Sequence, residues 1–120
     1  MTGRIRGIRG AIQVAEDTPE LVTSATHKLV AAMLERNTVS IDDLVSIIFT
    51  TTPDLRSTFP AAAARELGLG GVPLLCASEI DVPGALPRVV RVLMHAYVET
   101  AEIAHIYLDG AQVLRQDIAQ

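Results

Sequence analysis

Residues 4–12 have the sequence RIRGIRGAI, in which three arginines stand inside a short apolar run that predicts a β-strand over residues 4–14. A second run of the same kind is RVVRVLM at residues 88–94. Arginine is rarely buried unless an anion or another acceptor bonds its five N–H donors. We therefore expect these strands to present arginine to something small and anionic, most simply a carboxylate held by the fork of a guanidinium group.

The spacing of these arginines limits how many can share one pocket. Arg6 and Arg9 are three positions apart, as are Arg88 and Arg91. Side chains alternate between the two faces of a strand, so only one arginine of each pair can face a common pocket. The other is expected at the surface, with its stem on apolar neighbours. The periodicity does not show which arginine of each pair faces the pocket. For each of the four arginines, a surface position or a salt bridge stays open.

The composition describes a small protein with an aliphatic core. The chain has 120 residues, of which 49% are hydrophobic, 20% charged and only 3% aromatic, with no tryptophan. This length predicts a single domain, residues 1–120, whose core is built from Val, Ile, Leu and Ala. A chain this small with so much aliphatic surface often buries part of it against copies of itself.

Charge and cysteine content argue against several classes of protein. The formal net charge is −4, whereas a nucleic-acid-binding protein needs a basic face. No stretch comes near the ~18 apolar residues of a membrane span. The single cysteine, Cys76, has no partner for an internal disulfide, which is typical of a reducing compartment. We expect a cytoplasmic protein with neither nucleic-acid nor membrane partners.

The order of predicted elements indicates an α+β fold. Asp17 or Thr18 can cap a helix that has Pro19 in its first turn and ends near Asn37. A short alanine-rich helix is expected at residues 61–67, closed by glycines. Strands are expected at residues 45–51, 72–76, 88–96 and 103–108, with a last extended piece at residues 113–114. The expected architecture is a mixed β-sheet of about five strands, covered on one face by one long and one or two short helices.

Few side chains carry an obvious catalytic signature. Glu79 follows Cys76 at a strand end, where a polar residue either lines a site or is simply solvated. Cys76 itself is more typical of a small buried hydrophobic residue than of a nucleophile. Tyr107 shares a strand face with His105 and is compatible with a core position. The three histidines show no metal-ligand spacing, and no P-loop, dinucleotide motif or serine-hydrolase signature is present. These residues predict a carboxylate site without metal or cofactor, and leave the chemistry open.

Short segments along nearly the whole chain, taken in order, resemble the monofunctional AroH-type bacterial chorismate mutases. The matching pieces are RGIRGA (6–11), TPDL (52–55), FPA (59–61), REL (65–67), VP (72–73), Cys76, Glu79, RV (91–92), HIYL (105–108) and VLR (113–115). Each piece is short, and their order and spacing together make the resemblance specific.

The resemblance implies a cofactor-free rearrangement of chorismate to prephenate in aromatic amino-acid biosynthesis. It also implies a homotrimer of α+β subunits with the sites in clefts between them. Arg9 is then expected to hold a substrate carboxylate, and Arg91 to lie beside the ether oxygen where negative charge develops. Glu79 is the expected acceptor for the ring hydroxyl, and Tyr107 the donor to the side-chain carboxylate. The other expected substrate-binding residues, some from the neighbouring subunit, are Phe59, Ala61, Arg65, Leu75, Cys76, Leu114 and Arg115.

The sequence departs from the family pattern at three places. These departures leave the expected reaction type unchanged, but they bear on its rate and on how the C-terminal segment that carries Arg115, mobile in the family, closes over the site. Ala62 stands where a lysine is common, Gln116 stands where a proline often follows the arginine, and the loop before Tyr107 is slightly short. Two other functions stay open. One is a Rid-type imine/enamine deaminase on a related trimeric fold, although that family's characteristic segments are not found. The other is a non-catalytic binding module for an aromatic-pathway acid, which a test for activity on chorismate would distinguish.

Overall fold

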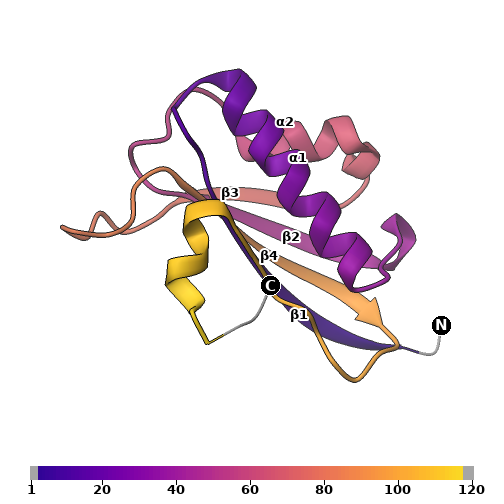
Figure 1. Ribbon diagram of the computed structural model, residues 1–120. Coiled ribbons are helices and arrows are strands. Elements are labelled where there is room, and N and C mark those ends of the chain that lie inside the picture. Colours follow the sequence, from indigo (N-terminus) through magenta and orange to yellow (C-terminus); the bar gives the residue numbers. More distant parts are fainter. Residues whose placement is uncertain (1–2, 118–120) are drawn as a thin grey trace.

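Five strands form one mixed sheet in the computed structural model, which describes residues 3–117 (Figure 1). The strand order is β3-β2-β4-β1-β5. Strand β4 runs antiparallel to both β1 and β2, whereas the β1/β5 and β2/β3 pairs are parallel. The bounds are β1 Arg4–Gln13, β2 Leu44–Thr51, β3 Leu74–Ser78, β4 Val89–Val98 and β5 Ile106–Leu108. The mixed sheet expected from the sequence is confirmed.

Helices α1 and α2 lie on one face of this sheet, as expected (Figure 1). The long helix α1 spans Pro19–Arg36, and the short helix α2 spans Pro60–Ala64 and continues into a π-helical turn, η2, at Arg65–Leu69. Short 3-10 helices lie at Ile41–Asp43 (η1) and Asp109–Arg115 (η3). Of the two candidate caps of α1, the structure has Thr18, whose hydroxyl accepts a hydrogen bond from the Leu21 amide at 3.2 Å.

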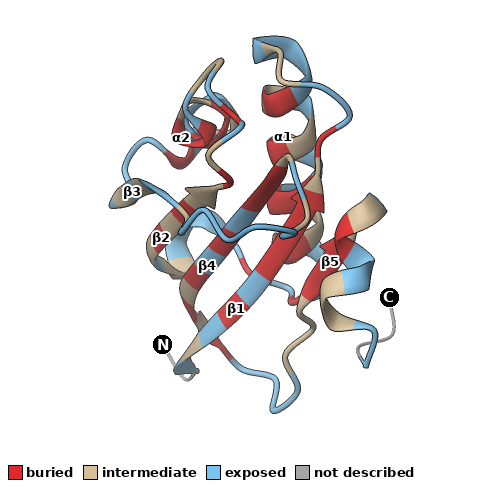
Figure 2. Ribbon diagram, turned by 90° about the vertical axis from the view of Figure 1, so that its left-hand side faces the viewer, coloured by how far each residue is buried: buried red, intermediate tan, exposed pale blue. Residues whose placement is uncertain are grey.

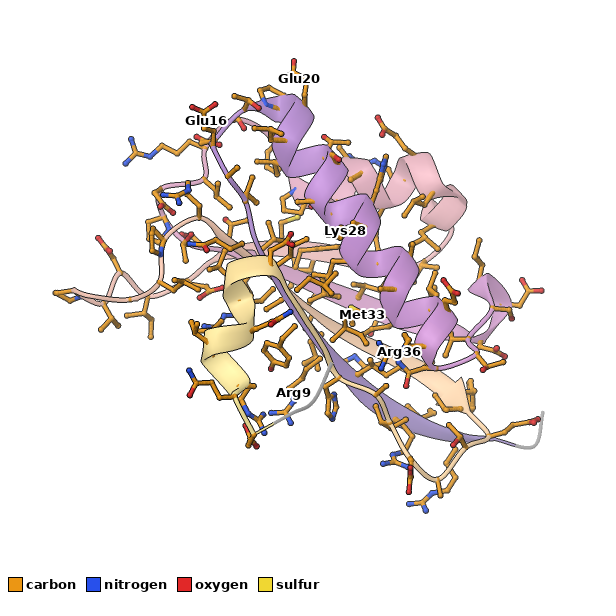
Figure 3. All side chains as sticks on the ribbon, viewed as in Figure 1. Arg9, Glu16, Glu20, Lys28, Met33 and Arg36 are labelled. Atoms are coloured by element: carbon orange, nitrogen blue, oxygen red, sulfur yellow. The ribbon has the colours of Figure 1, made fainter. Side chains whose placement is uncertain are left out.

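The core fills the space between the sheet and α1. Alternate residues of β1 and β4 face it, which gives these strands bands of buried and exposed residues (Figure 2). Gly10 lies on the buried face, and a Cβ built there would overlap the sulfur of Met33, which points from α1 toward the sheet (Figure 3). This glycine therefore allows α1 to approach β1 closely. The fully buried side chains include Ile8, Ile12, Leu29, Met33, Ile47, Phe49 and Met94.

Among residues 3–117, the opposite face of the sheet carries no helix except η3 at the β5 edge (Figure 1). Leu75 and Leu93 on this face are 61% and 37% exposed. We call this side the open face; Arg9 and Arg91 also lie on it, because they alternate with the buried residues of β1 and β4.

The C-terminal elements differ from the prediction in two places. The prediction of an extended piece at residues 113–114 is wrong, because these residues belong to η3. Asp109 has a φ of +54°, which turns the chain just after β5, and Ala111 is then fully buried against the sheet. The strand expected at residues 103–108 is shorter, since the side-chain amide of Asn37 binds both backbone groups of Ala104, at 2.8 and 2.9 Å.

Arg88 is not a strand residue, contrary to the sequence prediction. Its φ is +54°, and β4 begins only at Val89. The Arg88 amide donates to the carboxylate of Asp54, at 2.9 Å to Oδ2, and its Nε donates to the Val14 carbonyl at 2.9 Å. The turn into β4 is thus fixed by contacts to two other segments.

Candidate active site

Arg91, Glu79 and Thr50 form a polar cluster on the open face. Arg91 lies on β4 opposite Thr50 of β2, and Glu79 follows β3, on the other side of β2. The Nε atom of Arg91 is 3.3 Å from Oε2 of Glu79, and the Thr50 hydroxyl donates to the same oxygen at 2.7 Å. The Glu79 side chain is only 20% exposed, against 46% for Arg91. The carboxylate therefore orients the guanidinium while leaving much of it open to a ligand.

A depression of about 260 Å³ brings Arg91 together with Arg9 and Tyr107. Its remaining walls are Gly10, Ile48, Thr50, Val92 and Leu93. A second depression of about 320 Å³ lies beside it, lined by Glu79, Leu114 and residues 80–87, and Arg91 borders both. Two guanidinium groups and a phenol around a partly apolar hollow suit a small molecule with more than one anionic oxygen.

Arg9 reaches the depression from β1, on the side of the sheet away from α1 and close to η3 (Figure 3). Its backbone amide donates to Nδ1 of His105 at 3.0 Å. Burial, followed by the positive charges of Arg9, Arg115 and Arg6, lowers the pKa of His105 below the usual 6.5. His105 is therefore neutral at physiological pH, as its role as a hydrogen-bond acceptor requires.

Arg115 lies near Tyr107 but is bound to a carboxylate of its own chain. Its Nε and Nη2 atoms donate to the two oxygens of Asp117 at 3.0 and 2.8 Å. This hydrogen bonding, with a smaller contribution from Tyr107, raises the pKa of Arg115, and it lowers the pKa of Asp117. A substrate carboxylate would have to replace Asp117 in order to use this fork.

Within one chain, the structure brings together five of the expected site residues: Arg9, Glu79, Arg91, Tyr107 and Leu114. Five others line neither depression: Phe59, Ala61, Arg65, Leu75 and Cys76. Ala61 is buried in the core and Cys76 packs against that core, whereas Phe59 is 70% exposed and Leu75 is 61% exposed. Arg65 is exposed on η2.

Two residues at the site were not assigned from the sequence. Thr50 is one, and the strand alternation that places Ile48 and Thr50 on one face was the signal that could have found it. His105 was noted only as sharing a face with Tyr107, and its bond to the Arg9 amide has no sequence signature. Among residues 3–117, no group of three or more His, Cys, Asp or Glu side chains could hold a metal ion. The helices of the described part of the chain include none that is long and apolar enough to cross a membrane.

Comparison with known proteins shows the family of this chain. The sequence model of one family, chorismate mutase type I, matches residues 5–118. The chain belongs to the type I chorismate mutase family. Chorismate mutase AroH of Thermus thermophilus is 51% identical over 117 residues, which are 95% of this chain and 96% of that protein. Chorismate mutase AroH of Bacillus subtilis (strain 168) is 41% identical over 118 residues, 96% of this chain and 93% of that protein.

Solved structures give the same result for the fold of this type I chorismate mutase. A chorismate mutase from Clostridium thermocellum superimposes with a TM-score of 0.84 at 45% sequence identity. The match covers 90% of this chain and 98% of the other. The resemblance read from the short ordered segments is therefore confirmed over nearly the full length of the chain.

Proposed function

We propose that this chain converts chorismate to prephenate on the open face of its sheet, using Arg9, Arg91, Glu79 and Tyr107. The observation that carries the proposal is the depression that Arg9, Arg91 and Tyr107 line together, in a chain of the chorismate mutase family. Chorismate carries two carboxylates and rearranges within one molecule. One C–O bond breaks while one C–C bond forms, with no net transfer of a proton or an electron.

Arg91 is the group that stabilises the transition state. As the ether C–O bond breaks, negative charge builds on its oxygen, and a guanidinium beside that oxygen binds the transition state more strongly than the ground state. Glu79 holds the Nε edge of Arg91, and Thr50 donates a hydrogen bond to Glu79, so the remaining N–H donors of Arg91 can be directed into the hollow. Glu79 also supplies a carboxylate that can accept the substrate's ring hydroxyl.

Arg9 and Tyr107 hold the substrate in its reactive shape. The rearrangement requires a compact conformer in which the two reacting carbons lie close together. Binding the carboxylates through fixed donors selects that conformer and removes its entropic cost from the reaction step. Tyr107 is 5% exposed and fixed by its place on β5, opposite Ala11 of β1.

The enzyme acts as a homotrimer whose sites lie between subunits. Three features support this: the hollow in one chain, about 260 Å³, is small for a ligand site, the open face exposes Leu75 and Leu93, and Phe59 is exposed away from the hollow. A neighbouring chain would then supply Phe59 and Arg65 as further walls. Light scattering should give three times the chain mass of 12.8 kDa, and a monomer would contradict the shared site. We place this trimer in the cytoplasm, which its single free cysteine suits.

Incubation of purified protein with chorismate tests the proposed reaction. We expect chorismate absorbance to fall and prephenate to appear at the same rate, and EDTA to leave that rate unchanged. The turnover number should vary little between about pH 6 and about pH 9, because no proton moves and arginine stays charged. Binding of chorismate without conversion would show a binding module instead, and a dependence on metal would contradict the mechanism.

A further inference from the structure

One contact made by Arg9 is not used in the mechanism above. In the parallel pairing of β1 with β5, Gly10, Ala11 and Ile12 lie opposite Ile106, Tyr107 and Leu108. Arg9 lies one residue before this ladder, and the acceptor for its amide is the imidazole Nδ1 of His105 at 3.0 Å. On the β4 side, Arg9 lies opposite Leu93 within the β1/β4 ladder. On the β5 side, its amide is bound by a side chain rather than by a carbonyl of β5.

His105 itself is held from both sides. Ala104 is bound through its amide and its carbonyl to the side chain of Asn37, which is 2% exposed at the C-terminal end of α1. Ile106, on the other side, is fully buried. The backbone that carries the imidazole is therefore fixed. Hydrogen bonds join Asn37 to Ala104 and His105 to Arg9, so this segment connects the end of α1 to Arg9.

Burial of the ring and the charges around it favour the neutral form, which can accept a hydrogen bond. The groups that face it are Arg6 and Arg9 from β1 and Arg115 from η3, all positive, with the carboxylate of Asp117 near Arg9 and Arg115. Protonated His105 would carry hydrogen on both ring nitrogens and could not accept from the Arg9 amide. Neutral His105 with its proton on Nε2 fits the observed contact.

We propose that His105 is a positioning residue for Arg9: its imidazole fixes the backbone of β1 at Arg9, and so aims the guanidinium at a substrate carboxylate. The inference rests on the proposed role of Arg9 in binding that carboxylate. A contact of this kind acts on ground state and transition state alike. Its loss therefore raises KM for chorismate and leaves kcat nearly unchanged.

Three variants test this role. His105→Ala removes the acceptor, and KM should rise roughly 3- to 10-fold, the size expected for one lost neutral hydrogen bond. His105→Asn puts Oδ1 where Nδ1 was, and it should restore KM to within about 2-fold of wild type. The double variant Arg9→Ala/His105→Ala should be no worse than Arg9→Ala alone, since His105 acts through Arg9.

A matched control is His95→Ala, which removes a histidine on β4 that contacts the Ser46 hydroxyl at 3.2 Å. It should leave KM unchanged. If wild type is active and Arg9→Ala raises KM, the proposed function holds, and the role of His105 can then be judged separately. Additive effects of Arg9→Ala and His105→Ala would overturn that role, as would a lowered kcat with unchanged KM in His105→Ala, or failure of asparagine to restore KM.

Discussion

The Nε atom of Arg91 lies 3.3 Å from Oε2 of Glu79, although the two residues come from different segments of the chain. Strand β2 lies between β3 and β4 in the sheet, and its Thr50 donates to the same carboxylate oxygen at 2.7 Å. Three consecutive strands therefore contribute to the orientation of one guanidinium. An active site that works by placing charge at a developing anion needs such support, because a mobile arginine would lose much of its effect.

Thr50→Val should test this support directly. The variant keeps the shape of the side chain and removes the hydroxyl that holds Glu79, so we expect kcat to fall roughly 3- to 10-fold. Thr51→Val, one residue along β2 and on the other face, is the matched control. Steady-state kinetics should show little change for the control. Equal losses from both would mean that the strand, rather than the Thr50 hydroxyl, had been disturbed.

Tyr107→Phe should harm catalysis less than Arg9→Ala. The tyrosine variant loses one neutral donor, a change of about 0.5–1.5 kcal/mol, whereas loss of Arg9 removes a charged donor and leaves a substrate carboxylate poorly compensated. Comparison of kcat/KM on chorismate measures both losses. A larger loss for Tyr107→Phe would reverse the assigned roles of the two residues.

The lowered pKa of His105 predicts how stability depends on pH. Burial and the nearby arginines lower the folded-state pKa, so between that value and about 6.5 the unfolded chain binds more protons than the folded one. The contribution of His105 to the free energy of unfolding is therefore full above about pH 6.5 and is lost as the pH falls toward the folded-state value.

Urea unfolding of wild type and His105→Asn, at about pH 8 and about pH 5, measures this contribution. The asparagine variant does not titrate, so its stability should fall less between the two pH values than that of wild type. If wild type lost no more stability than the variant, the pKa of His105 would be the same in the folded and the unfolded chain, and the prediction would be wrong.

Arg88→Gln should affect folding rather than catalysis. The sequence placed Arg88 on β4, on the opposite face from Arg91, whereas the structure places it before the strand with its Nε bound to Val14. Loss of that hydrogen bond should lower the free energy of unfolding by about 0.5–1.5 kcal/mol. Turnover should stay within about 2-fold of wild type, since the side chain lines neither depression at the site. A large loss of turnover at unchanged stability would contradict this assignment.

Much of the fold was predictable because its determinants are local. Thr18 and Pro19 start α1 through short-range capping, and the alternation along β1 and β4 separates Arg9 and Arg91 from their buried neighbours. The family followed from short segments whose order resembles the chorismate mutases. The arginines in the strand-like runs by themselves predicted only a carboxylate site.

The rest depends on contacts between distant segments, which no local pattern encodes. Asn37 binds Ala104, 67 residues away, and β5 therefore begins only at Ile106. Asp54 binds the Arg88 amide and so fixes the turn before β4. The resemblance predicted Cys76 as a substrate-binding residue, but its side chain packs on the helix-facing core. Such placements become visible only when the register of the sheet is known.

The turnover number of Arg91→Gln is the measurement that tests the proposed mechanism most directly. Because the charge that Arg91 stabilises exists mainly in the transition state, kcat for chorismate should fall by at least the ~10²–10³-fold seen when a single oxyanion donor is lost. KM should change less, and Arg91→Lys should recover part of the rate, since it keeps the charge but not the planar fork. An unchanged kcat with a raised KM would instead show that Arg91 only binds the substrate, and the proposed stabilisation of the breaking C–O bond would be wrong.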